Sequence, residues 1–349
     1  MKVPPPTSFW RHLPRPFFCV APMANVTDVS FRATITEFAK PHVMWTEFVS
    51  CEALCSSSQA SRNRMLTALQ YAPEERPIVA QLFGSKPHQF RESAMLLRDL
   101  GFDGIDINMG CPEKNVNKQG SGAALILDPP NAMAIVRACQ EAGLPVSVKT
   151  RIGFHYIDYH DWINRILDTE PEALTIHGRT RDEMSAVPAH WDVIGDIVHL
   201  VKDKRQSTCV VIGNGDVESI QHAQSKVDEY GVDGVMIGRA LFGNPRMFQG
   251  TNWVVTETDG VHCRGGGCVG HDNASMSVEQ KCHGLLRHVY HFEQLLASTT
   301  SFHYVKKMFG SYLVGIPNAK VLREALAATS SPAQVYPLVE EFVAKSVRQ

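Results

Sequence analysis

The sequence predicts an α/β fold in which a (β/α)₈ TIM barrel is followed by a small C-terminal α-helical domain. Eight short apolar runs recur with a mean step of about 31 residues, which is the size of one βα unit. The runs are continuously apolar, as in parallel strands that are buried on both faces. Eight such units favour a closed barrel over an open doubly wound sheet. The runs begin near Phe17, Val43, Ile78, Gly104, Pro145, Ala173, Thr208 and Asp233.

The chain divides into four segments at points where its composition changes. Residues 1–16 are a proline-rich N-terminal extension, and residues 17–249 form the predicted barrel. Residues 250–276 contain three consecutive glycines and few large apolar side chains, so a linker or insertion loop is predicted there. Residues 277–349 have helical periodicity and form the predicted tail domain.

The predicted tail contains four helices. The first begins at Ser277, because Ser277 and Gln280 have the spacing of a capping box. A second helix is predicted over 304–314, Asn318 is expected to cap a third, and Pro332 opens a fourth. The apolar face of the first helix consists of Leu285, Leu286, Val289, Phe292 and Leu296.

Composition and charge limit the class of protein. The 349 residues carry a net charge of −2, so any RNA site must be a local patch. The tail has eight Lys and Arg against five acids, which favours the tail as the place for an anionic partner. Nine cysteines are too dilute for a disulfide framework, which indicates free thiols and a cytoplasmic location. No apolar stretch approaches the ~18 residues of a membrane span, and no obligate protein partner is evident.

Polar residues and glycines collect where the predicted strands end, which is the end of such a barrel that carries active sites. Two of these ends, 213–216 and 238–239, are glycine-rich turns whose backbone N–H groups can close on a phosphate, and Arg239 can add a charge-assisted bond. The strand ends in chain order are Ala21-Pro22-Met23, Glu47, Gln81, Asn108 to Pro112, Lys149-Thr150-Arg151, His177 to Arg181, Gly213-Asn214-Gly215-Asp216 and Gly238-Arg239.

Three of these positions have several possible roles. Lys149 would project into the barrel mouth, where it could neutralise an anionic cofactor, form a Schiff base or pair with a core acid such as Glu47. Gln81 could bind the edge of a heteroaromatic ring or be an ordinary polar strand end. Most cysteines are small buried hydrophobes, but Cys111 lies on an exposed loop where catalytic groups belong.

A zinc site is a further hypothesis, because zinc takes four Cys or His ligands. The candidate ligands are Cys263, Cys268, His271, Cys282 and His283. Their spacing is not the tight spacing of a zinc ribbon, so we expect no metal.

Taken together, the strand ends resemble the tRNA-dihydrouridine synthase family of flavin enzymes. The resemblance covers about residues 17–248 and continues more weakly through the tail. The motifs that carry it are Ala21-Pro22-Met23 with Thr27-Asp28 and Phe31-Arg32, Asn108 to Pro112 with Gly120 to Leu125, Lys149-Thr150-Arg151, His177 to Thr180, Gly213 to Asp216, and Gly238-Arg239-Ala240 with Gly243-Asn244-Pro245.

The resemblance implies an FMN cofactor, a tRNA substrate and a set of site residues. Cys111 would be the proton donor, and Asn108 would contact the flavin or the target base. The other residues implied to bind FMN are Pro22, Met23, Ala24, Gln81, Lys149, His177, Asn214, Gly215, Asp216, Gly238 and Arg239. The residues implied to contact RNA are Arg151, Arg179, Lys306, Lys307, Lys320 and Arg323.

The implied reaction reduces uridine to dihydrouridine. The uracil would leave its stack, at a cost of a few kcal/mol, to reach the flavin. Reduced flavin would deliver a hydride to C6 while Cys111 protonates C5, and NADPH would reduce the flavin again. No Gly-x-Gly-x-x-Gly fingerprint follows any of the eight predicted strands, so the nicotinamide would share the flavin face.

The sequence departs from the family pattern in three places. Asn25 replaces a common glycine, Lys306-Lys307 replaces a common Arg-Lys, and the 250–276 segment has no family counterpart. Two other functions remain open. One is an FMN-dependent TIM-barrel oxidoreductase acting on a small molecule, such as a dihydroorotate dehydrogenase, although it would need no basic tail. The other is a tRNA-binding module without turnover, against which the intact Cys111 and Lys149 argue.

Overall fold

The computed structural model describes residues 8–249, 253–256, 260–263 and 276–346. Its main body is one sheet of eight parallel strands in the order β1-β8-β7-β6-β5-β4-β3-β2. An isolated parallel bridge between Cys19 and Val43 joins the two remaining edges, so the sheet closes on itself. The predicted barrel is therefore confirmed. The strands are β1 Phe17–Val20, β2 Met44–Ser50, β3 Ile78–Phe83, β4 Gly104–Met109, β5 Val146–Arg151, β6 Ala173–His177, β7 Val210–Asn214 and β8 Gly234–Ile237.

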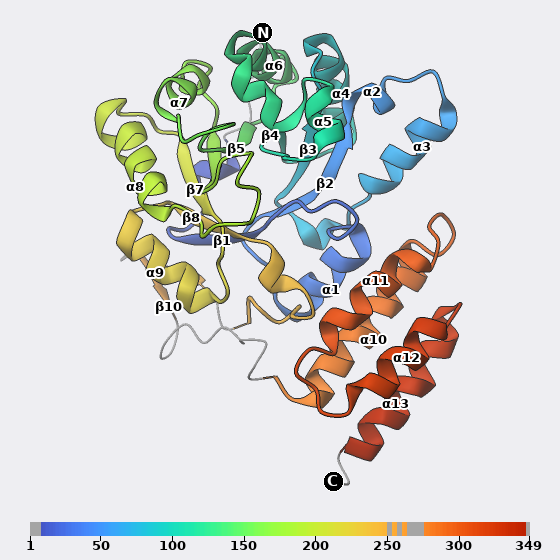
Figure 1. The fold of residues 1–349 in the computed structure, drawn as a ribbon. Coiled ribbons are helices and arrows are strands. Elements are labelled where there is room, and N and C mark those ends of the chain that lie inside the picture. Colours follow the sequence, from blue (N-terminus) through green and yellow to red (C-terminus); the bar gives the residue numbers. More distant parts are fainter. Residues whose placement is uncertain (1–7, 250–252, 257–259, 264–275, 347–349) are drawn as a thin grey trace.

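Helices surround the sheet, and each lies in the connection between two consecutive strands (Figure 1). After β8 the chain makes only a 3₁₀ turn, Arg239–Leu241, before it leaves the barrel. The helices between the strands are α1 Val29–Ala39, α2 Cys51–Leu54, α3 Gln59–Ala68, α4 Pro87–Asp99, α5 Lys114–Lys118, α6 Pro129–Gln140, α7 His160–Leu167, α8 Trp191–His199 and α9 Ile220–Tyr230.

The N-terminal extension contributes to the barrel from Ser8 onward. A 3₁₀ turn, Phe9–Arg11, buries Trp10 completely. The Trp10 ring lies 5.7 Å from the ring of Trp45 and 6.1 Å from that of Phe17, between centroids. Because these partners begin β2 and β1, Trp10 fills the end of the barrel opposite to the one where active sites lie.

A buried ion pair explains the Thr27-Asp28 and Phe31-Arg32 motif. The Arg32 guanidinium, on α1, donates to the Glu75 carboxylate at 2.5 Å and to the Thr27 carbonyl at 2.6 Å. Both charged groups are fully buried, so each depends on the other for stability. Asp28 caps α1 by accepting the N–H groups of Ser30 and Phe31. The pair fixes α1 to the segment that precedes β3.

The tail is a bundle of four helices, as predicted. They are α10 Val278–Leu295, α11 His303–Tyr312, α12 Ala319–Ala328 and α13 Val335–Ser346. The capping box at the start of α10 is formed, because Ser277 and Gln280 each bond the backbone N–H of the other. Asn318 precedes α12 with a left-handed φ of 57°, but its side chain makes no capping bond, so that detail of the prediction is wrong.

Helix α10 packs on α1 and so joins the tail to the barrel (Figure 1). The Glu37 carboxylate accepts from Arg287 at 2.9 Å and from His291 at 2.6 Å. The rings of Phe31 and His288 meet edge to face at 5.5 Å. The interface therefore combines an apolar contact with an ion pair at its rim.

The segment predicted as a linker contains secondary structure. Strands β9 Trp253–Thr256 and β10 Gly260–Cys263 pair as an antiparallel hairpin, which was not predicted from the sequence. None of the helices that the structure describes has both the length and the apolar character needed to cross a membrane.

Candidate active site

A cavity of about 740 Å³ opens where the eight strands end. Parallel strands of a barrel bring their carboxyl ends together, so residues far apart in sequence meet here. All the residues predicted to bind the cofactor line this cavity except Ala24, which lines a neighbouring pocket. The predicted residues in the cavity are Pro22, Met23, Gln81, Asn108, Lys149, His177, Asn214, Gly215, Asp216, Gly238 and Arg239, together with Cys111 and Arg151.

A buried chain of amides connects the barrel interior to the Cys111 loop. The Asp106 carboxylate accepts from Ser147 Oγ and from Gln81 Nε2, each at 2.6 Å. Gln81 Oε1 then accepts from Asn108 Nδ2 at 2.9 Å. Asn108 Oδ1 accepts from the backbone N–H of Cys111 at 2.9 Å. Asp106 therefore fixes the orientation of the Gln81 amide, and Gln81 fixes that of the Asn108 amide.

Asp106 lies at the base of this chain of hydrogen bonds and was not among the residues predicted from the sequence. Burial raises the pKa of its carboxyl to about 6, although the bonds from Gln81 and Ser147 favour the ionised form. A sequence signal for it exists. Asp106 and Asn108 are two residues apart on one strand, so they point to the same face of the sheet.

The Cys111 loop is held from both sides. The Cys111 carbonyl accepts from Asn117 Nδ2 at 2.7 Å and from the Ala123 N–H at 3.1 Å. Gly122 has a φ of +62°, and a Cβ there would lie 2.9 Å from the same carbonyl. This close approach explains why the second glycine of the 120–125 motif, Gly122, has no side chain. Burial raises the pKa of the Cys111 thiol, so the group stays protonated at neutral pH.

Lys149 is a half-buried cation beside the amide of Asn214. Its ammonium donates to Asn214 Oδ1 at 3.1 Å, and it does not pair with Glu47, which lines the neighbouring pocket. Burial, with help from the charge of Arg151, lowers the pKa of Lys149 to about 8. Burial and the cations Arg151 and Lys149 also hold the pKa of His177 well below its usual range, so this imidazole is neutral.

The glycine-rich turns form the side of the cavity expected to hold a phosphate. Gly215 has a φ of +133°, and a Cβ there would lie 2.7 Å from the Ala189 Cβ. Asp216 Oδ1 accepts from Arg239 Nη2 at 2.9 Å, while Asp216 Oδ2 accepts from the Ala189 N–H at 2.9 Å and from Arg179. Burial opposes ionisation of Asp216, but these bonds prevail and lower its pKa. The carboxylate therefore positions Arg239.

Two arginines predicted to contact RNA are nearly buried by the protein itself. Arg151 lines the cavity, but its guanidinium donates to the carbonyls of Gly110 at 2.7 Å and Thr180 at 2.9 Å. Arg179 is only 3% exposed, does not line the cavity and bonds to Asp216. In this structure both brace the loops around the cavity, and an RNA contact by either remains a prediction.

The basic residues of the tail lie apart from the cavity. Lys306 donates to the Ala327 carbonyl at 2.7 Å, and Arg323 donates to the Leu313 carbonyl at 2.9 Å. Lys307 and Lys320 are exposed, and the Lys307 ammonium lies 4.9 Å from the centre of the Tyr304 ring. Only two of the four predicted RNA contacts are thus free of a bond to the tail's own backbone.

The zinc hypothesis finds no support in the residues that can be placed. Cys268 and His271 lie outside the described residues, and Cys282 is buried in α10. His283 Nδ1 lies 3.1 Å from Arg246 Nη2. The described part of the chain contains no group of three His, Cys, Asp or Glu residues that could hold a metal ion.

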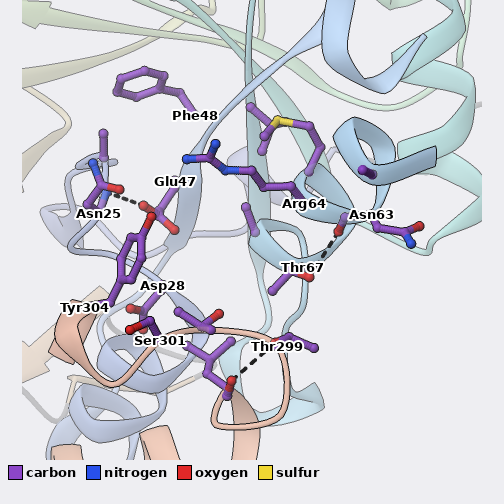
Figure 2. Close-up of a pocket in the computed structure, with 17 residues that line it drawn as sticks. Asn25, Asp28, Glu47, Phe48, Asn63, Arg64, Thr67, Thr299, Ser301 and Tyr304 are labelled. Carbon is purple, nitrogen blue, oxygen red and sulfur yellow. Dashed lines mark hydrogen bonds between the residues drawn. The ribbon is translucent and has the colours of Figure 1, made fainter. Parts of the chain in front are cut away.

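A second pocket adjoins the first and was not foreseen from the sequence. Its volume is about 610 Å³, and it lies between α3, the end of β2 and the connection from α10 to α11 (Figure 2). We call it the interdomain pocket. Phe48 lines both cavities, so the two share a wall. No sequence signal could have found it, because its walls come from segments about 250 residues apart and interact only in the folded chain.

Comparison with known proteins gives a consistent result. The dihydrouridine synthase family model matches residues 19–348. A probable tRNA-dihydrouridine synthase of Staphylococcus epidermidis is 39% identical over 343 residues, which are 97% of each chain. Probable tRNA-dihydrouridine synthase 2 of Bacillus subtilis is 44% identical over 243 residues, which are 69% of this chain and 74% of the relative.

A solved structure extends the likeness at the level of the fold alone. A 2-naphthoyl-CoA reductase complex superimposes with a TM-score of 0.53 at 9% identity, over 67% of this chain and 49% of that one. The family match, by contrast, spans both the barrel and the tail. On this breadth of agreement the chain belongs to the dihydrouridine synthase family.

Proposed function

We propose that this protein is an FMN-dependent tRNA-dihydrouridine synthase, which reduces the C5=C6 bond of one uridine in tRNA. The observation that carries the proposal is the cavity at the ends of the barrel strands, which both the protonated thiol of Cys111 and the half-buried ammonium of Lys149 line. The family membership and the printed names of the relatives support the same activity. We propose a cytoplasmic location, because free thiols suit a reducing compartment.

The residues of the cavity fit FMN. A volume of about 740 Å³ is in the usual range for a cofactor site. The absence of a Cβ at Gly215 lets the turn pack against Ala189 with a positive φ, and Arg239, oriented by Asp216, can bind a phosphate beside it. Lys149 bonds to one acceptor, Asn214, so two of its three N–H groups remain for a ligand. Gln81, Asn108 and His177 would contact the ring, beside Pro22 and Met23.

Bound in this cavity, FMN would supply a hydride to C6 of the uracil. Cys111 holds the matching proton at Sγ and donates it to C5, so the base gains one hydride and one proton. The thiolate left behind regains a proton from water. Asn108 fixes the backbone on which the thiol stands, through its bond to the Cys111 N–H. The charge of Lys149 favours a negative group beside it, and NADPH is the reductant that we propose.

Replacement of the thiol tests this assignment. Cys111→Ala should retain FMN, accept electrons from NADPH and bind tRNA, because none of these steps needs the thiol. Oxidation of the reduced flavin by unmodified tRNA should slow by ~10²- to 10⁴-fold, the usual effect of losing a positioned acid. In the wild type that rate should stay level through neutral pH and fall in the alkaline range as the thiol ionises, because its pKa is raised. The measurement is anaerobic single-turnover absorbance.

Three results would contradict the proposal. Equal rates in Cys111→Ala and the wild type would remove the thiol from the reaction. Colourless protein that binds tRNA would indicate a module without turnover. Yellow protein that forms no dihydrouridine in tRNA would instead favour an oxidoreductase acting on a small molecule. Mapping of dihydrouridine in tRNA from cells that lack this protein would identify the uridine.

A further inference from the structure

We infer that the interdomain pocket binds a second nucleobase of the tRNA, the one that adjoins the uridine being reduced. The inference rests on the proposed function, since it requires a tRNA whose target base has left its stack. The pocket lies directly beside the candidate active site, and Phe48 forms part of both walls (Figure 2). A base that flips out leaves its neighbour without a stacking partner, and an aromatic ring nearby can take that place.

The pocket supplies such a ring. Tyr304, from α11, lines it opposite the barrel residues, and Figure 2 shows its hydroxyl directed toward Glu47 and Asn25. Within the described chain the Tyr304 hydroxyl has no hydrogen bond, and the Lys307 ammonium lies 4.9 Å from the centre of its ring. A flat aromatic surface beside a lysine suits a nucleotide, because the ring stacks on a base and the ammonium attracts a phosphate.

Hydrogen-bonding groups surround this ring. Helix α3 buries none of its residues and lines the pocket with Asn63, Arg64 and Thr67. In the described part of the chain, no hydrogen bond or ion pair holds the Arg64 guanidinium. It is exposed and is drawn beside Glu47 in Figure 2. Among the described residues, Asn63 and Thr67 bond only within α3, where Asn63 Oδ1 accepts from Gln59 and Thr67 Oγ1 donates to the Asn63 carbonyl. The edge of a base offers donors and acceptors to the groups that remain, above all to Arg64.

Glu47 indicates which kind of base fits. One carboxylate oxygen accepts from the Asn25 N–H, and the other makes no hydrogen bond within the described residues. Burial and the neighbouring Asp28 raise the pKa of Glu47 to about 7, so water solvates this carboxyl poorly. An exocyclic amino group is the donor that a carboxylate accepts most readily from a base. Adenine, guanine and cytosine carry one and uracil does not, so the pocket should disfavour uracil.

Matched variants test the inference in the full-length, FMN-loaded protein. Arg64→Ala removes a charge that lines the pocket, and Arg62→Ala removes the same charge from α3 outside it. Tyr304→Leu removes the ring, and Tyr304→Phe keeps it. Binding to an unmodified tRNA transcript is measured for each. Tyr304→Leu should weaken binding roughly 5- to 150-fold, the effect of one lost stacking contact, while Tyr304→Phe stays close to the wild type.

The transcript supplies an independent measurement. In the wild type, changing the nucleotide on one side of the target to uridine should weaken binding, and the same change on the other side should not. The Tyr304→Leu variant should bind the original and the changed transcript equally well. Arg64→Ala should flatten the salt dependence by up to ~0.9 log units, and Arg62→Ala should not. If Tyr304→Leu lowers the melting temperature or the flavin content, its weaker binding could come from damage to the fold. The inference is then tested by Arg64→Ala and by wild-type binding to the changed transcripts.

Two failures are distinguishable. If the wild type forms dihydrouridine but all four variants bind tRNA equally, or Tyr304→Leu still discriminates the changed transcript, the pocket does not hold a base and the proposed function stands. If the wild type reduces no uridine in any tRNA, the proposed function falls and this inference falls with it.

Discussion

Asp106 controls the orientation of two amides that it supports, although it lies below the surface of the cavity. Gln81 presents its NH₂ to Asp106 and therefore its oxygen to Asn108, which in turn presents its own oxygen to the Cys111 N–H. The order of donors and acceptors along this chain depends on a group at its base that only accepts. A carboxylate is such a group.

Asp106→Asn should therefore disturb the Cys111 loop without changing its sequence. With the new NH₂ toward Gln81, two NH₂ groups would be opposed, and a flip of Gln81 would oppose its NH₂ to that of Asn108 instead. With the new NH₂ toward Ser147, the hydroxyl would have to accept and turn its own proton to the more distant Ile105 carbonyl. The free energy of unfolding should fall by ~1–3 kcal/mol, the cost of an unsatisfied buried group. Cys111 should also react faster with a thiol reagent, and its tRNA-dependent step should slow.

Ser147→Ala is the control for this prediction. It removes the other bond to Asp106 but leaves Gln81 correctly oriented. Chemical denaturation and thiol titration would check both variants. Unchanged Cys111 reactivity in Asp106→Asn would show that the loop does not depend on the chain of amides.

At the scale of elements, the positions of the strands could be predicted from the sequence, whereas the contacts of the charged side chains could not. Every predicted strand begins within two residues of the observed one, because a strand buried on both faces must be apolar throughout. Lys306 and Arg179 were predicted as RNA contacts from the family resemblance and their positive charge. The structure uses Lys306 to bond the carbonyl of Ala327 and uses Arg179 to hold Asp216. A sequence does not reveal whether a cation faces a ligand or its own backbone.

The adjacent lysines Lys306 and Lys307 on α11 differ in this respect, because Lys306 bonds to a backbone carbonyl and Lys307 is exposed. Lys307→Ala should weaken tRNA binding and flatten its salt dependence by up to ~0.9 log units, because Lys307 is exposed. Lys306→Ala should instead lower stability by about 1 kcal/mol, because it frees the last carbonyls of α12. Melting temperature and salt-dependent binding of the two variants check the prediction. It is wrong if both variants lose affinity and keep their stability.

At the scale of the whole molecule, the barrel is closed at one end and open at the other. Trp10 fills the closed end, where it contacts Trp45 and Phe17. Trp10→Ala should reduce the free energy of unfolding by ~3–5 kcal/mol, the usual cost of emptying a large buried site. Arg11→Ala, at an exposed neighbour, should change it by less than ~0.5 kcal/mol. Denaturant titration measures both, and equal values would mean that the extension does not support the barrel.

The packing of α10 on α1 limits how the tail can be removed or exchanged by engineering. Helix α1 is capped by Asp28, which lines the interdomain pocket, and carries Glu37, which holds Arg287 and His291. A chain cut before Ser277 would expose the surface of α1 that now meets α10 and would also leave Glu37 without both partners. The tail is thus not an exchangeable module. A chimera that takes its tail from a relative would need to take the matching α1 surface as well, so the tail and the barrel sequence have to change together.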